Sequence, residues 1–267
     1  MVETQAHQAV IVPCPGWQQQ AEQLAAKLGL QLARPENRYP LILRYCDTGL
    51  ELVKNDDPSL AGPVRVDFTS GSYTFRRRCQ KRELLIRAVG VKADTPLDIL
   101  DGTGGLGRDG FMLAAAGCRV HIFEREPIIA ALLADGLKRA RSHPKTAAIC
   151  RRIQLTHGDV LEVLETMQQT GRQVDVIYLD PMFPQRKKSA KVKKEARMLQ
   201  LLAPVDDSSK RLLEAALTAA AKRVVVKRPL RAPCLSPLSP SHSHNGTTIR
   251  FDVYLTGSGR QVMSVQK

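Results

Sequence analysis

Two short segments of the chain combine residue types that could do chemistry: one is rich in glycine and the other is an Asp-Pro-Met-Phe run. The first runs from Asp101 to Gly107, between an apolar run and a segment with helical apolar spacing that starts at Phe111. Glycines allow positive φ and close approach of a ligand, and the start of a following helix offers unpaired N–H groups. The Asp101 carboxylate could accept hydrogen bonds from an ammonium or hydroxyl group. The pattern predicts a strand, a tight turn and a helix that bind a nucleotide-like ligand.

The glycine segment by itself is compatible with two ligand classes. Gly102, Gly104 and Gly107 match the G-x-G-x-x-G pattern of dinucleotide-binding proteins, which alone is a weak signal. Counted from Asp101, the same residues match the looser acid-then-small-residue pattern of enzymes that use S-adenosylmethionine (SAM). A glycine-rich turn without a ligand is the third alternative. A second site is needed to decide between them.

That second site is Asp180, which follows a very apolar run and precedes Pro181, Met182 and Phe183. The lone pair of an exocyclic amino nitrogen is delocalised into its base, so the amine must be held and reoriented before it can attack a methyl donor. The Asp180 carboxylate and the Pro181 carbonyl can accept hydrogen bonds from the two N–H groups, and Phe183 can stack on an extruded base. The alternative is an Asx-Pro turn after a buried strand. A dehydrogenase has no need of this segment, which therefore favours methylation of an amino nitrogen.

Three further polar residues follow predicted strands. Glu124 lies where doubly wound folds place an acid on the ribose hydroxyls, and Arg125 could flank the adenosine. Asp159 precedes a predicted helix at 160–167. It could accept from an adenine amino group or cap that helix, and the sequence leaves both interpretations open.

The charge of the chain indicates a polyanionic partner. Its 267 residues carry 40 Lys and Arg against 26 acidic residues, a formal net charge of +14, which favours nucleic acid over an acidic membrane surface. No apolar run is long enough to span a bilayer, and no secretory signal is visible. The six cysteines are scattered without a C-x-x-C pair, which argues against a zinc site or a disulfide framework. We expect a cytoplasmic, monomeric protein that binds no metal ion.

Two basic stretches are candidates for contact with RNA phosphates, although each could instead be a solvated face. One is a predicted helix at 74–89, and the other follows Phe183. The candidate residues are Arg76, Arg77, Arg78, Arg186, Lys187, Lys188, Lys191, Lys193 and Lys194. Lys227 and Arg228 are expected at the same rim.

Hydrophobic periodicity predicts the elements that position these residues. From residue 97 onward strands alternate with helices, which predicts an α/β, doubly wound, Rossmann-like parallel sheet. Its strands are expected at 97–101, 119–123, 153–156, 174–179, 222–227 and 249–255. Residues 1–74 predict a small α+β cap, and residues 75–267 the ligand-binding domain. The strands of the cap are expected at 10–12, 40–45, 50–54 and 64–68. A Pro/Ser/His-rich segment at 229–245 is expected to be a loop, and its two histidines are not expected to bind metal.

The chain also contains longer motifs that are typical of one family. They are Asp98–Asp101, Gly104–Asp109, Gly117–Val120, Glu124–Arg125, Tyr178–Pro184, Lys188–Ala190, Val192–Glu195, Lys222–Pro229 and Arg250–Asp252. On these motifs the chain resembles the RsmJ family, the bacterial small-subunit ribosomal RNA guanine-N2 methyltransferases. The resemblance extends from Val64 to Leu255.

The resemblance implies a class I SAM-dependent methyltransferase that modifies the N2 amine of one guanine near the 3′ end of 16S rRNA. The partner would be this RNA or the small ribosomal subunit, and the second product S-adenosylhomocysteine. By motif, the resemblance implies SAM contacts at Arg108, Asp109, Glu124, Arg125, Asp159, Val160 and Asp180. Gly102 and Gly104 stand where it leads us to expect alanines.

Three rival functions stay open on the sequence. Methylation of adenine N6 needs the same grip on an amine. A nicotinamide oxidoreductase would use the glycine segment but not the Asp-Pro-Met-Phe segment. A non-catalytic ribosome-assembly factor would bind RNA through its basic surface. The favoured hypothesis is direct methyl transfer driven by positioning, because no cysteine is placed to form a covalent intermediate.

Overall fold

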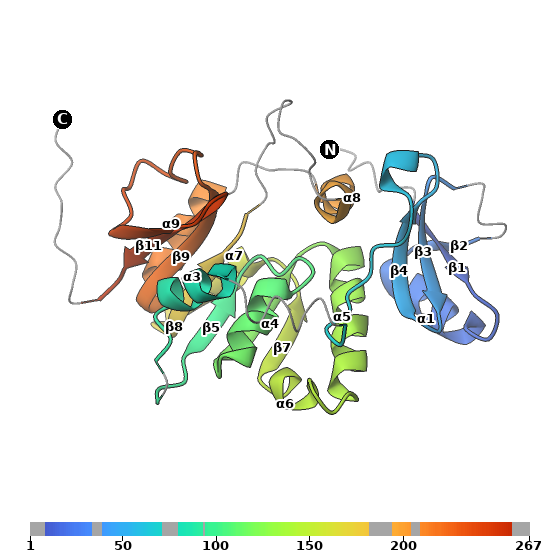
Figure 1. Ribbon diagram of the computed structural model, residues 1–267, viewed down its shortest axis with the longest axis horizontal. Helices are drawn as coiled ribbons and strands as arrows, with labels where there is room; N and C mark the ends of the chain where they lie inside the picture. The colour runs from blue at the N-terminus through green and yellow to red at the C-terminus, as the bar shows by residue number, and fades with distance from the viewer. Residues whose placement is uncertain are drawn as a thin grey trace. The chain divides into compact units, whose positions relative to one another are not determined.

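The computed structural model of the chain describes residues 9–33, 39–70, 80–92, 94–181, 194–203 and 209–257. The chain divides into two compact units that interleave along the sequence (Figure 1). The first contains Met1–Thr69, Glu126–Ala147 and Met182–Val205, and the second Ser70–Arg125, Ala148–Pro181 and Asp206–Lys267. The two-domain boundary between residues 74 and 75 stays a prediction.

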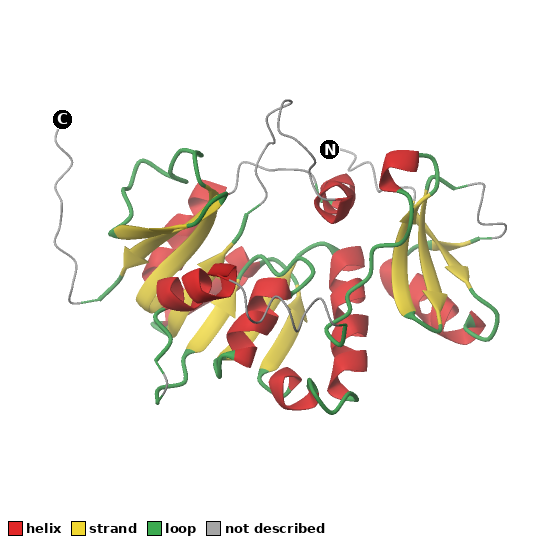
Figure 2. Cartoon of the chain, in the orientation of Figure 1, coloured by secondary structure: helices red, strands yellow, loops and turns green. Residues whose placement is uncertain are grey.

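The second unit is built on a seven-stranded sheet with helices packed against it (Figure 2). Its strands are β5 (Asp98–Asp101), β6 (Arg119–Glu124), β7 (Ile153–His157), β8 (Val174–Leu179), β9 (Ala220–Pro229), β10 (His242–Asn245) and β11 (Ile249–Leu255). The helices are α3 (Gln80–Val89), α4 (Arg108–Ala115), α7 (Val160–Thr170) and α9 (Ser209–Ala219), and the short helix α6 (Ala147–Cys150) precedes β7.

The strand order in this sheet is β10-β11-β9-β8-β5-β6-β7. The strands from β5 to β9 pair in parallel, whereas β11 is antiparallel to both β9 and β10. Among the strands described in this sheet, β11 alone therefore runs against the others. The predicted doubly wound sheet is confirmed for β5 to β9. The loop expected at 229–245 is wrong for His242–Asn245, which pair with β11.

Strand alternation gives the sheet two differently occupied faces. Ile177 and Leu179 of β8 pack into one core with α7 and α9, through residues such as Leu164 and Leu213. Tyr178, between them, points to the opposite face, where its hydroxyl bonds to a side chain of α4. The strands are apolar on both faces because helices cover both.

The glycine segment connects β5 to α4 by a turn that packs directly on β6. The N–H of Gly104 donates to the carbonyl of Phe123 at 2.8 Å. A Cβ on Gly104 would lie 2.6 Å from Cγ2 of Ile122 and 2.9 Å from that carbonyl oxygen. Alanine at this position therefore does not fit between the turn and β6 unless one of them moves. Gly107, with φ 70°, ends the turn in the left-handed conformation and caps α4.

The first unit contains a four-stranded sheet of order β2-β1-β3-β4. Its elements are β1 (Ala9–Pro13), α1 (Gln18–Leu28), β2 (Gln31–Leu32), β3 (Leu41–Cys46), β4 (Gly49–Lys54), the 3₁₀ helix η2 (Pro58–Leu60), α5 (Pro127–Arg141) and α8 (Lys194–Leu202). Strand β1 is parallel to β2 and β3, and β3 and β4 form an antiparallel hairpin. The strand predicted at 64–68 is wrong, because Val64 forms only an isolated bridge with Leu52.

Polar contacts attach α5 to β4 within this unit. The N–H of Leu50 donates to Oδ2 of Asp135 at 3.0 Å, and Nε of Arg139 donates to the same oxygen at 2.9 Å. A second guanidinium nitrogen of Arg139 donates to the carbonyl of Val66 at 2.5 Å. Since Asp135 is largely buried, these bonds hold together segments about 85 residues apart in sequence.

We expect Gly104→Ala to lower the free energy of unfolding by about 1–3 kcal/mol, because the new methyl group meets backbone and a packed side chain. Gly158→Ala is the matched control, since no atom of the described part of the chain lies within 4 Å of the Cβ position there. Its effect should stay within about 0.5 kcal/mol. Denaturant unfolding followed by circular dichroism measures both. Equal stability of the two variants would contradict the packing described for the turn.

Candidate active site

The chain reverses its direction of winding between β5 and β8. From β5 it proceeds to β6 and β7 on one side, whereas β9 lies on the other side of β8. Such a reversal opens a crevice at the carboxyl ends of the two strands. Asp101 is the last residue of β5, and Asp180 follows the last residue of β8. The backbone N–H of Asp180 donates to Oγ1 of Thr103 at 2.6 Å, so the two predicted segments lie side by side.

A buried ammonium group joins the two segments more tightly. Nζ of Lys227 donates to Oδ2 of Asp109 at 2.6 Å and also to Oδ2 of Asp180. The hydroxyl of Tyr178 donates to the same Asp109 oxygen at 2.6 Å. The Lys227 side chain is 13% exposed, whereas that of Asp180 is 37% exposed. Asp180 is thus the member of the cluster most open to a partner.

Burial and charge set the protonation of this cluster. Burial raises the pKa of Asp101 to about 8, and the carboxylates of Asp109 and Asp180 add to the rise. Burial alone would lower the pKa of Lys227, but the two bound carboxylates outweigh it and raise the pKa. Burial, together with Asp109, likewise raises the pKa of the Tyr178 hydroxyl. At neutral pH the Asp101 carboxyl is therefore largely protonated. The single ammonium of Lys227 is shared by the carboxylates of Asp109 and Asp180, so the cluster suits a cationic ligand.

The end of β6 borders the same glycine turn. Glu124 is buried, and its Oε2 accepts from the N–H of Gly105 at 2.6 Å. Gly105 has φ 53°, and among the residues that the structure describes a Cβ there would meet only a carbonyl oxygen 4.0 Å away. Open space therefore lies above the turn beside a carboxylate that can accept further hydrogen bonds.

The remaining predicted cofactor residues lie around this edge of the sheet. Asp159 is the N-cap of α7, where its Oδ1 accepts from the N–H of Leu161 at 2.9 Å. The capping interpretation is confirmed, and an adenine contact stays a prediction. Val160 is buried beside Gly102, whereas Arg125 is exposed. Arg108 is the first residue of α4, and Pro181 is buried.

The predicted RNA contacts have mixed outcomes. Residues outside the described part of the chain are Arg76, Arg77, Arg78, Phe183, Arg186, Lys187, Lys188, Lys191 and Lys193. Lys194 is described, and its ammonium donates to the carbonyls of Ala61, Gly62 and Pro63 within the first unit. Its contact with RNA stays a prediction, although these carbonyls occupy its donors.

The expectation that Lys227 and Arg228 face an RNA backbone is wrong. Lys227 is committed to two carboxylates, and Arg228 is 4% exposed with its guanidinium donating to the carbonyl of Pro233. Sequence reasoning therefore missed Lys227 as part of the cluster, together with Tyr178 and Thr103. The available signal was a single lysine directly after the buried run Val224–Val226, which belongs to a strand neighbouring β8.

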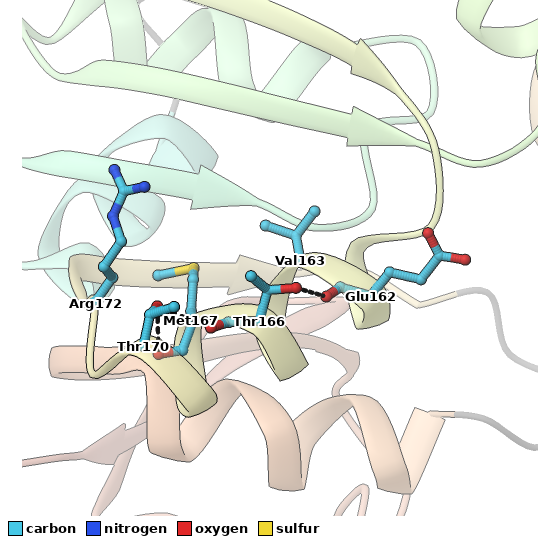
Figure 3. Close-up of a pocket in the computed structure, with 6 residues that line it drawn as sticks. All are labelled: Glu162, Val163, Thr166, Met167, Thr170 and Arg172. Atoms are coloured by element: carbon cyan, nitrogen blue, oxygen red, sulfur yellow. Dashed lines mark hydrogen bonds between the residues drawn. The ribbon is translucent and has the colours of Figure 1, made fainter.

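A separate hollow of about 350 Å³ runs along α7 (Figure 3). It is lined by Glu162, Val163, Thr166, Met167, Thr170 and Arg172. None of these residues was predicted to bind a ligand. Within the described residues, no group of three or more His, Cys, Asp or Glu could hold a metal ion. No helix in that part of the chain is long and apolar enough to cross a membrane.

Comparisons with known proteins identify the family to which the chain belongs. A family model described as "Putative SAM-dependent methyltransferase" matches residues 23–256. The ribosomal RNA small subunit methyltransferase J of Thioalkalivibrio sulfidiphilus is 48% identical over 241 residues, which cover 90% of this chain and 94% of that protein. The chain belongs to the ribosomal RNA small subunit methyltransferase J family. The methyltransferase J of Tolumonas auensis is 45% identical over 249 residues, covering 92% of this chain and 97% of that protein.

The fold of this methyltransferase J family member also has a solved counterpart. The crystal structure of a SAM-dependent methyltransferase from Neisseria gonorrhoeae matches with a TM-score of 0.75 and 30% identity, covering 96% of this chain and 99% of that chain. The family and the class I Rossmann-like methyltransferase fold predicted from the sequence are both confirmed.

We expect Asp101 to contribute to the stability of the ligand-free protein at about pH 4 and to lose this contribution as the pH rises to about 8. Its raised native pKa means that the native state keeps a proton that the unfolded state releases near the ordinary value of 3.8. Asp101→Asn carries no titrating group there and should not show this loss over the same range. Unfolding by urea at several pH values measures the difference. The exposed Asp94→Asn is the control and should keep the pH dependence of the wild type, whereas the same dependence in Asp101→Asn would refute the assignment.

Proposed function

We propose that this chain transfers the methyl group of SAM to the exocyclic N2 amine of one guanine in 16S rRNA. The observation that carries the proposal is the position of the Asp180 carboxylate, held beside the glycine turn through Thr103 and Lys227. Its relatives are ribosomal RNA small subunit methyltransferases by name, which supports the choice of substrate.

The residues at the strand ends fit SAM by their chemistry. SAM supplies an electrophilic methyl group on a positively charged sulfur. The carboxylates of Asp109 and Asp180 share the single ammonium of Lys227, and this arrangement favours such a cation over an anionic ligand. Glu124 offers carboxylate oxygens for the ribose diol, and the open side of Gly105 admits the ligand to the backbone of the turn. Gly102, Gly104, Arg108, Arg125, Asp159 and Val160 complete the proposed cofactor site.

Asp180 and Pro181 act on the guanine amine in this proposal. Lys227 bonds to Oδ2 of Asp180, so Oδ1 is placed to accept one N–H of the amine, and the Pro181 carbonyl accepts the other. The lone pair is thereby turned toward the methyl donor, and the N–C bond forms by direct displacement as the S–C bond breaks. The Asp180 carboxylate is placed to receive the proton that the nitrogen then loses. Phe183 stacks on the extruded base.

The RNA is held by positive charge. The net charge of +14 supports binding of an RNA backbone, with Arg76, Arg77, Arg78 and the basic residues from Arg186 to Lys194 as proposed contacts. We also propose that the chain acts as a monomer.

We expect the protein to incorporate label from tritiated SAM into small ribosomal subunits or 16S rRNA that lack the modification, and nuclease digestion to yield N2-methylguanosine. Testing unmodified subunits and free RNA in parallel shows whether the enzyme acts on the assembled subunit or on the RNA alone. N6-methyladenosine as the product would favour the adenine alternative. RNA binding without any transfer, despite bound SAM, would favour an assembly factor and overturn the proposal.

We expect Asp180→Ala to lower kcat at least about 100-fold, since one preorganised group at a reacting centre contributes on that order. RNA affinity should change less than about threefold, because the substitution removes one acceptor and no phosphate contact. Asp180→Asn keeps an acceptor oxygen and should retain more activity than the alanine variant. Asp175→Asn, at the opposite end of β8, is the matched control. Parallel loss of RNA binding and turnover in Asp180→Ala would contradict this role for Asp180.

A further inference from the structure

Lys227 connects two carboxylates that belong to different parts of the proposed reaction. Asp109 lies in the first turn of α4, at the cofactor side of the crevice, and Asp180 lies at the amine side. Both bond to the same ammonium, which is largely buried between them. The net charge of the chain alone suggests that a lysine here contacts RNA phosphates. Such a lysine would be exposed, whereas Lys227 is not.

We propose that Lys227 is a positioning residue for methyl transfer, whose ammonium fixes the Asp180 carboxylate in its accepting orientation. This inference rests on the proposed role of Asp180. Lys227 itself touches neither the methyl group nor the amine.

The sheet dictates where Lys227 lies. Strands β8 and β9 are parallel, with Leu179 paired to Val226, so the next residues along each strand are Asp180 and Lys227. The ammonium then reaches Asp109 on the face that α4 covers. Three elements, β8, β9 and α4, therefore converge on one atom. Their packing fixes the distance between the cofactor side and the amine side.

The backbone of Asp180 does not depend on Lys227. Its N–H donates to Oγ1 of Thr103 at 2.6 Å, which fixes the chain at this point independently. Loss of the ammonium would therefore release the carboxylate group while the main chain stays in place. The consequence is a defect in turnover more than in binding of SAM or RNA.

The charges around Lys227 give its removal a recognisable signature. The groups that face it are Asp101 from β5, Asp109 from α4, Tyr178 from β8 and Asp180 itself. Without the ammonium, the negative charges of the cluster have no counter-charge, and its carboxyl groups retain protons to higher pH. Fewer carboxylate acceptors then face the amine, so activity should depend on pH.

The test compares Lys227→Met, Lys227→Arg and the wild type over pH 6 to 9. We expect Lys227→Met to lose at least tenfold in kcat at pH 7, to recover in part as pH rises, and to keep KM values for SAM and RNA within threefold. Lys227→Arg preserves the charge and should restore most of kcat and the wild-type pH profile. Lys222→Met is the matched control, because it removes an ammonium of the same strand that pairs with Asp175 outside the crevice, and it should keep the wild-type profile.

A double-variant comparison separates positioning from folding. In an Asp180→Asn background the carboxylate that the ammonium is proposed to fix is absent, although Asp109 still pairs with Lys227, so adding Lys227→Met should cost less than threefold in kcat. The double variant also carries one negative charge fewer than Lys227→Met alone. The comparison therefore remains informative if Lys227→Met alone does not fold. A tenfold or larger loss in that background, or a wild-type kcat and pH profile in folded Lys227→Met, would overturn the proposal. If the wild type methylates a base other than guanine, the proposed substrate fails while the test of Lys227 still stands.

Discussion

The arrangement of the second unit depends on one buried positive charge. The ammonium of Lys227 lies between Asp109 and Asp180, and a buried ammonium is tolerated only when it is paired. Its partners come from a helix and from the end of a neighbouring strand, so the pairing requires β8, β9 and α4 to keep one relative position. Two carboxylates share this one ammonium, which makes the crevice suited to a cation. The contacts of Lys227 with Asp109 and Asp180 thus determine both the packing of these elements and the preference for a cationic ligand.

The main chain brings these side chains together. Parallel strands end at one edge of the sheet, and the winding reverses between β5 and β8, so their terminal aspartates border the same crevice. The turn after β5 then packs on β6 through the N–H of Gly104, where a Cβ would not fit. Glycine at this position, in place of the alanine expected from the family resemblance, allows that approach. The carboxylate of Glu124 completes the edge by binding the same turn.

Much of the fold could be predicted because apolar runs of strand length alternate with helical patterns from residue 97 onward. The ends of these runs identified Asp101, Glu124 and Asp180 before their contacts were known. The strand β10 and the reversed direction of β11 depend on pairing between strands, which local patterns do not encode. Lys227 was misassigned because a basic residue in a highly basic chain indicates RNA until its neighbours in space are known. The bond between Leu50 and Asp135, 85 residues apart, shows why the grouping of α5 with the first sheet was likewise not visible.

The most direct test is a crystal structure of the protein with S-adenosylhomocysteine and a short RNA that contains the target guanine. We expect the sulfur to lie over the turn from Gly102 to Gly107, and Oδ1 of Asp180 to lie within about 3.2 Å of the guanine N2. Lys227 should remain on Oδ2 of the same carboxylate. A guanine bound away from the ends of β5 and β8, or an Asp180 carboxylate turned away from the bound base, would contradict the account.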